Sequence, residues 1–349
     1  MNVNNVNNVN NVCNVNNVCN GNNGRNGNKS WKKFFAALGI SAAFLVGYFV
    51  MQILVTFVSS MLISISESFK TIFSISGGAP DGNETDYSDV ASEVTHRLMK
   101  NMPWILIVSA LITVGIILLI VLIMKKSGRW DMYKILRSPQ KGFRAAGVGI
   151  LCFLGGLVFN LGFSGLLELL PVPQSWLDAN NESVGAIMGG NIIAVILATS
   201  VMAPIVEELL FRGIFYNSIR KTLPAGEKLS VIVCGLLVSV VFGIYHGNIL
   251  QAIYCCIFSF VLVAIQERTG TVWWPILAHA GFNSSWLIAF VPSAEKLYQD
   301  PSAAALIFLP VSVIVFAAAL FLGKNNEKYA ADSNSQSDGG TYRDYFTNV

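Results

Sequence analysis

The chain has 349 residues, of which 53% are hydrophobic and only 12% are charged. Soluble globular proteins carry about twice this charged fraction, so one soluble globule could not keep this much apolar surface away from water. The 23 basic and 20 acidic residues leave a formal net charge of +3, which provides no basic surface for nucleic acid. Composition therefore predicts a membrane protein that crosses the bilayer several times, and it excludes nucleic-acid binding.

The two ends of the chain are polar. Residues 1–30 repeat Asn-Asn-Val and then become rich in Gly and Asn. Such a low-complexity segment has too little apolar mass to pack, so we expect it to be a disordered tail. We expect the polar residues 324–349 to be disordered as well.

Between these tails, eight apolar stretches are long enough, or nearly so, to cross a bilayer as helices. A membrane-spanning helix needs about 20 such residues. The stretches lie at 34–60, 103–124, 145–167, 187–216, 229–247, 249–266, 271–291 and 303–323. The fifth and sixth are expected to meet at a tight turn around Gly247 and Asn248. The predicted fold class is all-α, a polytopic membrane helical bundle of about eight transmembrane helices.

Charges in the connecting segments predict the orientation. Basic residues precede the first helix, fill the loop after the second, and follow the fourth and the eighth. The alternate loops, 65–102 and 168–186, are acidic. Because Lys and Arg are enriched on the cytoplasmic side of membrane proteins, we expect both termini to be cytoplasmic.

The fourth helix carries two adjacent carboxylates, Glu207 and Glu208, although apolar residues continue beyond them. A charge at the bilayer centre is costly unless it is paired or wetted. Glu208 and Arg212 are four residues apart, so they share a helix face and can form an ion pair. Glu207 points roughly 100° away, which leaves it free to face a cavity and to act as a general base or acid.

Two of the three histidines also lie in apolar segments. His246 closes the fifth helix, and His279 lies in the seventh, where Asn283 follows on the same face. Any one of these side chains could simply bond to a neighbouring helix. Together with the paired carboxylates they indicate a catalytic site.

The pattern Glu-Glu-x-x-x-Arg, then Phe-x-x-x-His, then His-x-x-x-Asn, on the fourth, fifth and seventh helices, resembles the CPBP intramembrane proteases. These are the CAAX-processing and bacteriocin-processing enzymes, also called the Abi family. The resemblance covers residues 185–292 and implies that this segment is the protease core. Residues 31–184 would then hold the first three helices and their loops, and residues 293–323 the last helix.

The resemblance also implies roles for these residues. Glu207 would be the base that activates the hydrolytic water, with His246 assisting. The ion pair of Glu208 and Arg212 would structure the site. As donors, the His-x-x-x-Asn pair of the seventh helix would polarise the scissile carbonyl or hold its oxyanion, as amide hydrolysis requires.

A divalent metal, zinc above all, is a further possibility, with Glu207, His246 and His279 as ligands. Bound zinc would bring the pKa of its water near 7. The sequence does not contain the His-Glu-x-x-His motif that places two ligands one helical turn apart. Members of the family are commonly named metalloproteases, and a metal-free glutamate mechanism is argued for relatives, so both mechanisms stay open. No other cofactor is expected.

The expected function is therefore an intramembrane endopeptidase whose partners are membrane lipid and a peptide or lipidated-peptide substrate. By resemblance, its substrates would be prenylated CAAX-type C-termini or, in bacteria, leader peptides of small secreted peptides. One alternative is a proton-coupled transporter in which the glutamates and histidines form a proton relay. The other is a catalytically silent membrane scaffold or immunity-type protein. The membrane would be the plasma membrane of a bacterium or the endoplasmic reticulum of a eukaryote.

Overall fold

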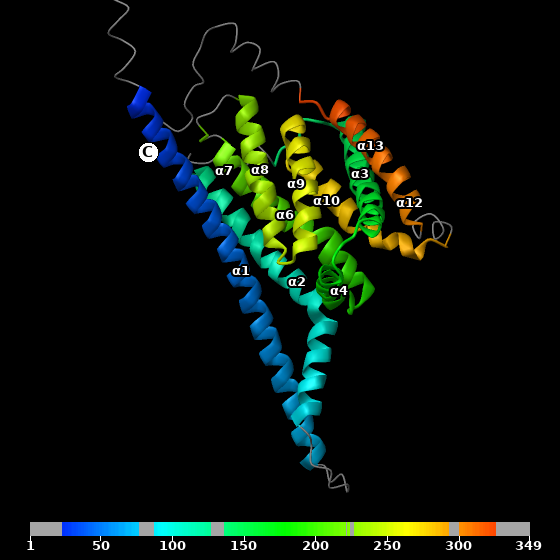
Figure 1. Ribbon diagram of the computed structural model, residues 1–349. Helices are drawn as coiled ribbons and strands as arrows, with labels where there is room; N and C mark the ends of the chain where they lie inside the picture. The colour runs from blue at the N-terminus through cyan, green and yellow to red at the C-terminus, as the bar shows by residue number, and fades with distance from the viewer. Residues whose placement is uncertain are drawn as a thin grey trace, which may run out of the picture.

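The structure, a computed structural model, is a bundle of helices (Figure 1). It describes residues 23–76, 87–126, 136–220, 222–223, 227–292 and 300–325. The two expected tails therefore lie mostly outside the described residues, although the first helix begins at Asn23, within the expected N-terminal tail. The predicted all-α fold class is confirmed for the described part of the chain.

The helices follow the expected order, with additions. The main α-helices are α1 (Asn23–Ser76), α2 (Tyr87–Lys126), α3 (Gly142–Leu169), α4 (Gln174–Met188), α8 (Glu227–Tyr245), α9 (Ile249–Thr269) and α10 (Trp273–Asn283). Between α4 and α8 runs a composite helix made of α5 (Ile192–Val195), η2 (Ile196–Met202), α6 (Ala203–Glu208), η3 (Leu209–Tyr216) and α7 (Asn217–Arg220). The chain closes with η4 (Ser285–Phe290), α12 (Pro301–Ala303), η6 (Ala304–Phe308) and α13 (Leu309–Leu322).

The described residues hold seven helices that are long and apolar enough to cross a membrane, one fewer than expected. The exception is the stretch 271–291, where α10 has 11 residues and is followed by the short 3₁₀ segment η4. Eleven residues rise only about 16 Å along a helix, which is roughly half of a hydrocarbon core. The chain still passes from one end of the bundle toward the other through α10, and α12 and α13 return beside α3 (Figure 1).

Two segments that were expected to be loops are helical. The described parts of the acidic segment 65–102 belong to α1 and α2, which are longer than the bundle is high and converge beyond it (Figure 1). There Glu67 pairs with Lys70 at 2.9 Å and with Arg97 at 3.1 Å. The second segment contains α4, which is polar and buries no residue. Charged and polar composition signals solvent exposure, and these two segments show that exposed residues can still be helical.

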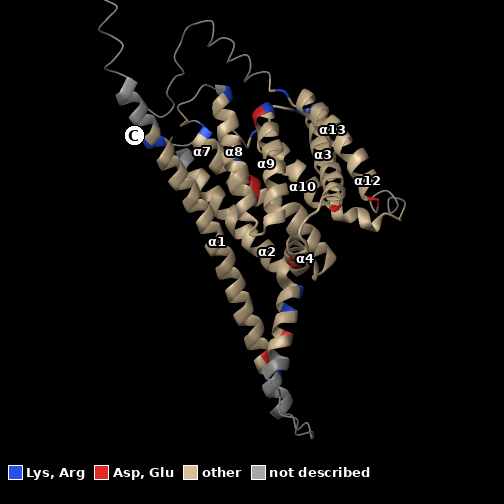
Figure 2. Cartoon of the chain, viewed as in Figure 1, with Lys and Arg blue, Asp and Glu red and all other residues tan. Residues whose placement is uncertain are grey.

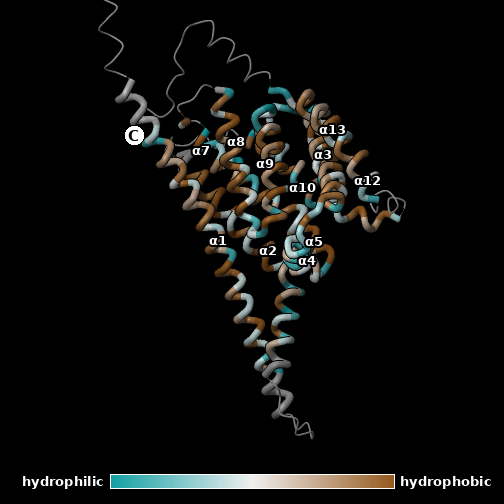
Figure 3. The backbone as a smooth tube through the Cα atoms, in the orientation of Figure 1, coloured by the Kyte–Doolittle hydropathy of each residue, from teal (hydrophilic) through white to brown (hydrophobic). Residues whose placement is uncertain are grey.

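Charge and hydropathy agree with a bundle in a bilayer. In Figure 2, the Lys and Arg residues gather at the end of the bundle where α1 begins and α9 ends. The hydropathy colouring of Figure 3 runs brown along most spans, and α4 stands out as polar. The chain is thus an integral, multi-pass membrane protein. The start of α1 and the end of α13 lie at the same end of the bundle (Figure 1), and the cytoplasmic placement of that end stays a prediction.

Glycines bring α3 and α10 into backbone contact. A Cβ atom added at Gly156 would lie 1.8 Å from the carbonyl oxygen of Ala278, and one added at Gly281 would lie 1.9 Å from that of Phe153. Small residues allow this close approach of membrane helices. The packing fixes α10, and therefore His279, against the rest of the bundle.

Gly281→Ala is expected to lower both the stability and any activity of the protein. The added methyl group meets a backbone oxygen, so α3 and α10 must separate, and overpacking of this kind costs about 1–3 kcal/mol. Gly147→Ala on α3 is the matched control, because its added Cβ would approach a single side-chain atom at 4.0 Å. Thermal unfolding in detergent should show a lower Tm for Gly281→Ala alone. Equal Tm values for the two variants would contradict the packing argument.

Candidate active site

The two adjacent carboxylates lie at a distorted part of the composite helix. Glu207 and Glu208 end the short α-helical segment α6, and the flanking segments η2 and η3 are π-helical. Pro204 has no N–H to offer to the preceding turn, and the neighbouring Ala203 N–H bonds to the carbonyl of Ala198, five residues back. π-Helical turns are rare and frequently occur at functional sites.

Glu208 and Arg212 form the predicted ion pair. Arg212 Nη1 donates to Glu208 Oε1 at 2.9 Å, and neither side chain has any exposed surface. Arg212 Nη2 donates to the Ser259 hydroxyl at 2.6 Å and to the Ser259 carbonyl at 3.1 Å. The guanidinium carbon also lies 4.6 Å from the centre of the Phe242 ring. A buried ion pair needs such additional partners to offset the cost of desolvation.

The His279 ring faces both carboxylates. Its Nδ1 lies 2.8 Å from Glu208 Oε1, and its Nε2 lies 3.7 Å from Glu207 Oε2. A carboxylate oxygen in an ion pair only accepts, so Nδ1 carries a proton, and in the neutral form of the ring Nε2 is an acceptor. The distance of 3.7 Å is too long for a direct hydrogen bond. His279 therefore turns Nδ1 toward Glu208 and Nε2 toward Glu207.

The Phe242 ring brings the predicted motifs together. Its centroid lies 4.9 Å from that of His246 and 5.8 Å from that of His279, and the Arg212 guanidinium lies over its face. Phe242, the first residue of the Phe-x-x-x-His motif, thus packs against residues of all three motifs. Sequence reasoning assigned it no role, since a phenylalanine in an apolar helix is ordinarily part of the core.

His246 occupies the turn between α8 and α9, outside both spans. Its Nδ1 lies 2.8 Å from the Phe242 carbonyl oxygen, so Nδ1 donates and Nε2 is left as an acceptor. Burial lowers the pKa of its imidazole to about 4, against the opposing effect of this hydrogen bond. The ring is therefore neutral at pH 7. The predicted tight turn is confirmed, with Gly247 at a φ of 77° and Asn248 capping α9.

Asn283 shares a face of α10 with His279, as expected, and that face packs on the composite helix. Its Nδ2 donates to the carbonyl oxygen of Thr199 at 2.9 Å, and the backbone carbonyl oxygen of Asn283 accepts from the Ser200 hydroxyl at 3.4 Å. The side chain thus contacts the π-helical segment η2 rather than the carboxylates. An amide group has two N–H donors, so this contact uses one of them.

The expected metal ligands are not grouped as a set. Glu207 and His279 face one another, but His246 bonds to a backbone carbonyl. Within the described part of the chain, no three His, Cys, Asp or Glu side chains are arranged so that they could hold a metal ion. These residues do not fit a three-ligand zinc site in this arrangement, so we derive no step through a metal.

Ser259 of α9 is a site residue that sequence reasoning missed. It is fully buried and contacts Arg212 through both its hydroxyl and its carbonyl. Serine is common in apolar helices, and no spacing rule links it to a residue 47 positions away. Only the packing of α9 against the composite helix reveals the contact.

The comparisons with known proteins indicate the same family as the three motifs. Residues 189–285 match the family described as type II CAAX prenyl endopeptidase Rce1-like, and this segment contains every expected site residue. A curated relative, "Putative membrane peptidase YdiL" of Bacillus subtilis (strain 168), is 25% identical over 170 residues. The alignment covers 48% of this chain and 66% of the relative, which is just under two thirds of its length. No solved structure gives a significant match.

The family match lies wholly within the segment 185–292 that carries the three motifs, and it leaves α1 to α4, α12 and α13 outside. The resemblance of the motifs to the CPBP proteases is therefore confirmed, and residues 189–285 of this multi-pass membrane protein match the Rce1-like family.

Proposed function

We propose that this protein is an intramembrane endopeptidase in which Glu207 is the general base. The observation that carries the proposal is the contrast between the two carboxylates. Glu208 is fully buried and occupied by Arg212 and His279, whereas the Glu207 side chain is 11% exposed and faces the acceptor nitrogen of His279 at 3.7 Å. Of the two, only Glu207 has any exposed side-chain surface, so it is the carboxylate that we place beside the substrate and the water molecule.

The geometry supports a simple hydrolytic mechanism. Two acceptors 3.7 Å apart can each receive one hydrogen of the same water molecule, which leaves an oxygen lone pair directed at the substrate. Glu207 takes a proton as the water oxygen attacks the scissile carbonyl carbon, and a tetrahedral oxyanion forms. The proton then passes to the leaving nitrogen as the C–N bond breaks.

Asn283 is the donor that we assign to the oxyanion. Its amide lies one helical turn beyond His279 on the same face of α10, and Thr199 holds it by one of its two N–H groups. The remaining N–H can bond to the charge that develops on the carbonyl oxygen. An oxyanion-hole donor of this kind contributes about 10²–10³-fold in kcat.

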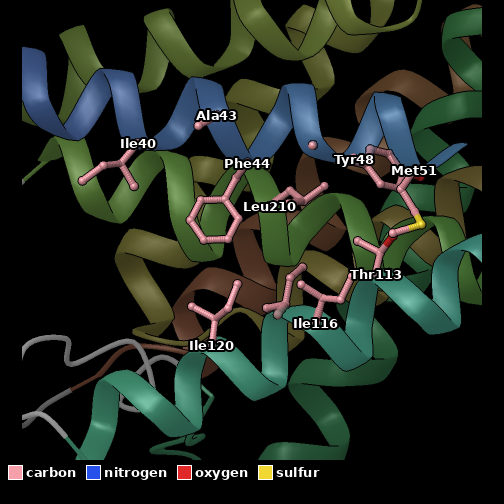
Figure 4. A pocket seen from close by; sticks show the side chains of 11 residues that line it. Ile40, Ala43, Phe44, Tyr48, Met51, Thr113, Ile116, Ile120 and Leu210 are labelled. Carbon is pink, nitrogen blue, oxygen red and sulfur yellow. The ribbon is translucent and has the colours of Figure 1, made fainter. Parts of the chain in front are cut away.

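An apolar groove beside the site favours a lipid-linked substrate. The groove has a volume of about 370 Å³ and lies between α1 and α2, with Leu210 of the composite helix between them (Figure 4). It adjoins the site, because Leu210 follows Glu207 by one turn and Tyr48 stacks on Tyr245, the neighbour of His246. Its lining is almost wholly apolar, which suits an isoprenoid chain better than a hydrated leader peptide. We therefore assign prenylated, CAAX-type C-terminal peptides as the substrate class.

Gly47→Leu is expected to raise KM for a prenylated peptide roughly tenfold with a smaller effect on kcat. Gly47 lines the groove, and a Cβ there meets no atom within 4 Å, so the new side chain enters the space that the lipid would occupy. Gly39→Leu is the matched control, since Gly39 lies on the same helix with equally open surroundings but does not line the groove. Steady-state kinetics in detergent would measure both variants. Equal KM values would contradict a role for the groove.

The function itself is tested by cleavage with the purified protein in detergent, using prenylated CAAX peptides and a panel of secreted-peptide precursors. We expect cleavage of the prenylated peptides that His279→Ala abolishes. Cleavage of the precursors alone would replace the substrate class by leader peptides. Proton-dependent uptake into vesicles without any cleavage would favour the transporter. Chelator sensitivity would bring a metal back into the mechanism.

A further inference from the structure

The Arg212 guanidinium is fixed from two sides inside the bundle. On one side it donates to Glu208, which lies one turn earlier on the same composite helix. On the other it meets Ser259 of α9, whose hydroxyl and carbonyl accept from the same nitrogen at 2.6 and 3.1 Å. Both Arg212 and Ser259 are fully buried. The polar contact with α9 therefore lies in a region where water does not compete for it.

The contact continues toward the proposed reaction centre. Glu208 Oε1 accepts from Arg212 at 2.9 Å and lies 2.8 Å from His279 Nδ1. The same histidine turns Nε2 toward Glu207. Four side chains thus form one chain of hydrogen bonds that begins on α9 and ends at the water-activating pair.

We propose that Ser259 is a positioning residue, which acts on catalysis through Arg212 and Glu208 by fixing the orientation and tautomer of His279. The inference rests on the proposed function. The hydroxyl sets where the guanidinium lies, the guanidinium sets the rotamer of Glu208, and Glu208 holds the proton on Nδ1. Hydrogen bonds from neighbouring residues commonly decide whether a catalytic side chain is held in the orientation that the reaction needs.

Ser259→Ala should weaken this arrangement without abolishing it. The variant keeps the backbone carbonyl of residue 259, so Arg212 retains one of its two acceptors on α9. We expect kcat to fall about 10- to 100-fold, the effect of losing a hydrogen bond to a charged group, while KM changes less than twofold. Ser259→Thr keeps a hydroxyl and is expected to recover a large part of kcat.

Ser239→Ala is the matched control. Ser239 is also a fully buried serine of a membrane-spanning helix, α8, and its hydroxyl has no hydrogen-bond partner among the described residues. The two substitutions remove the same atom from similar surroundings. A loss of kcat that arose from packing alone would appear in both variants.

A spectroscopic measurement separates this inference from the proposed function. The chain has only three histidines, so ¹⁵N-histidine labelling gives a spectrum of three rings that NMR in detergent can assign. Ser259→Ala should shift the Nδ1–H resonance of His279 and leave those of His96 and His246 in place. Ser239→Ala should shift none of them.

These readouts decide the inference in every case. A His279 resonance that does not move in Ser259→Ala overturns it, whatever happens to kcat. Equal kinetics for Ser259→Ala and Ser239→Ala overturn it as well. If wild-type protein cleaves no peptide, the proposed function fails, and the His279 resonance still shows whether Ser259 positions that ring.

Discussion

Replacing Glu207 by Gln is expected to lower kcat for peptide cleavage by about 10²–10⁴-fold while leaving the protein folded. The amide has the same shape as the carboxylate but cannot take a proton from water. Glu207 Oε2 is buried and has no hydrogen-bond partner among the described residues, so the substitution breaks no hydrogen bond of this oxygen. A largely buried carboxylate without a hydrogen-bonded cation is costly to desolvate, so its replacement by a neutral amide should not destabilise the fold. The expected result is therefore a low kcat with an unchanged or higher Tm.

Glu182→Gln is the control for this experiment, because Glu182 lies exposed on the polar helix α4, away from the carboxylate pair. It should retain wild-type kinetics. Cleavage and unfolding would be measured on the same detergent preparations. If Glu207→Gln cleaves the peptide as fast as wild type, Glu207 is not the base, and the scaffold or transporter interpretation gains. If it unfolds, Glu207 has a structural role that the contacts do not show.

The parts of the site that sequence predicted are those that local geometry determines. The ion pair of Glu208 and Arg212 and the shared face of His279 and Asn283 follow from spacing of four residues on a helix, and the structure confirms both. The positions of most spans follow from hydropathy in the same way. Each of these predictions needs only the residues of one helix.

The rest depends on how helices pack, which spacing does not encode. His279 meets Glu208 across 71 residues of sequence, and Ser259 meets Arg212 across 47. The stretch 271–291 has the hydropathy of a span, yet α10 ends at Asn283, where Ser284 N–H bonds to the carbonyls of Ala280 and Gly281 before the 3₁₀ segment begins. Apolar composition alone therefore does not predict where α10 ends.

Arg212→Met is expected to destabilise the protein by about 3–5 kcal/mol, the largest loss of stability that we predict. The cause is the loss of the cation that pairs with Glu208. Glu208 has no exposed surface, so its carboxylate would remain buried without a cation. The Ser259 hydroxyl would also lose the guanidinium at 2.6 Å. Unfolding of the purified variant in detergent, followed by denaturant titration, would measure the change.

The double variant Arg212→Met with Glu208→Leu tests this cause. With both charges gone, no buried ion is left unpaired, and replacing a buried ion pair by apolar side chains is often neutral or stabilising. We expect the double variant to recover most of the stability that Arg212→Met loses. It should remain inactive, because His279 Nδ1 has lost the acceptor that fixes its tautomer. The single variant Glu208→Leu completes the comparison. If the double variant loses as much stability as the two single variants together, the two side chains are not coupled, and Arg212 stabilises the bundle by other contacts.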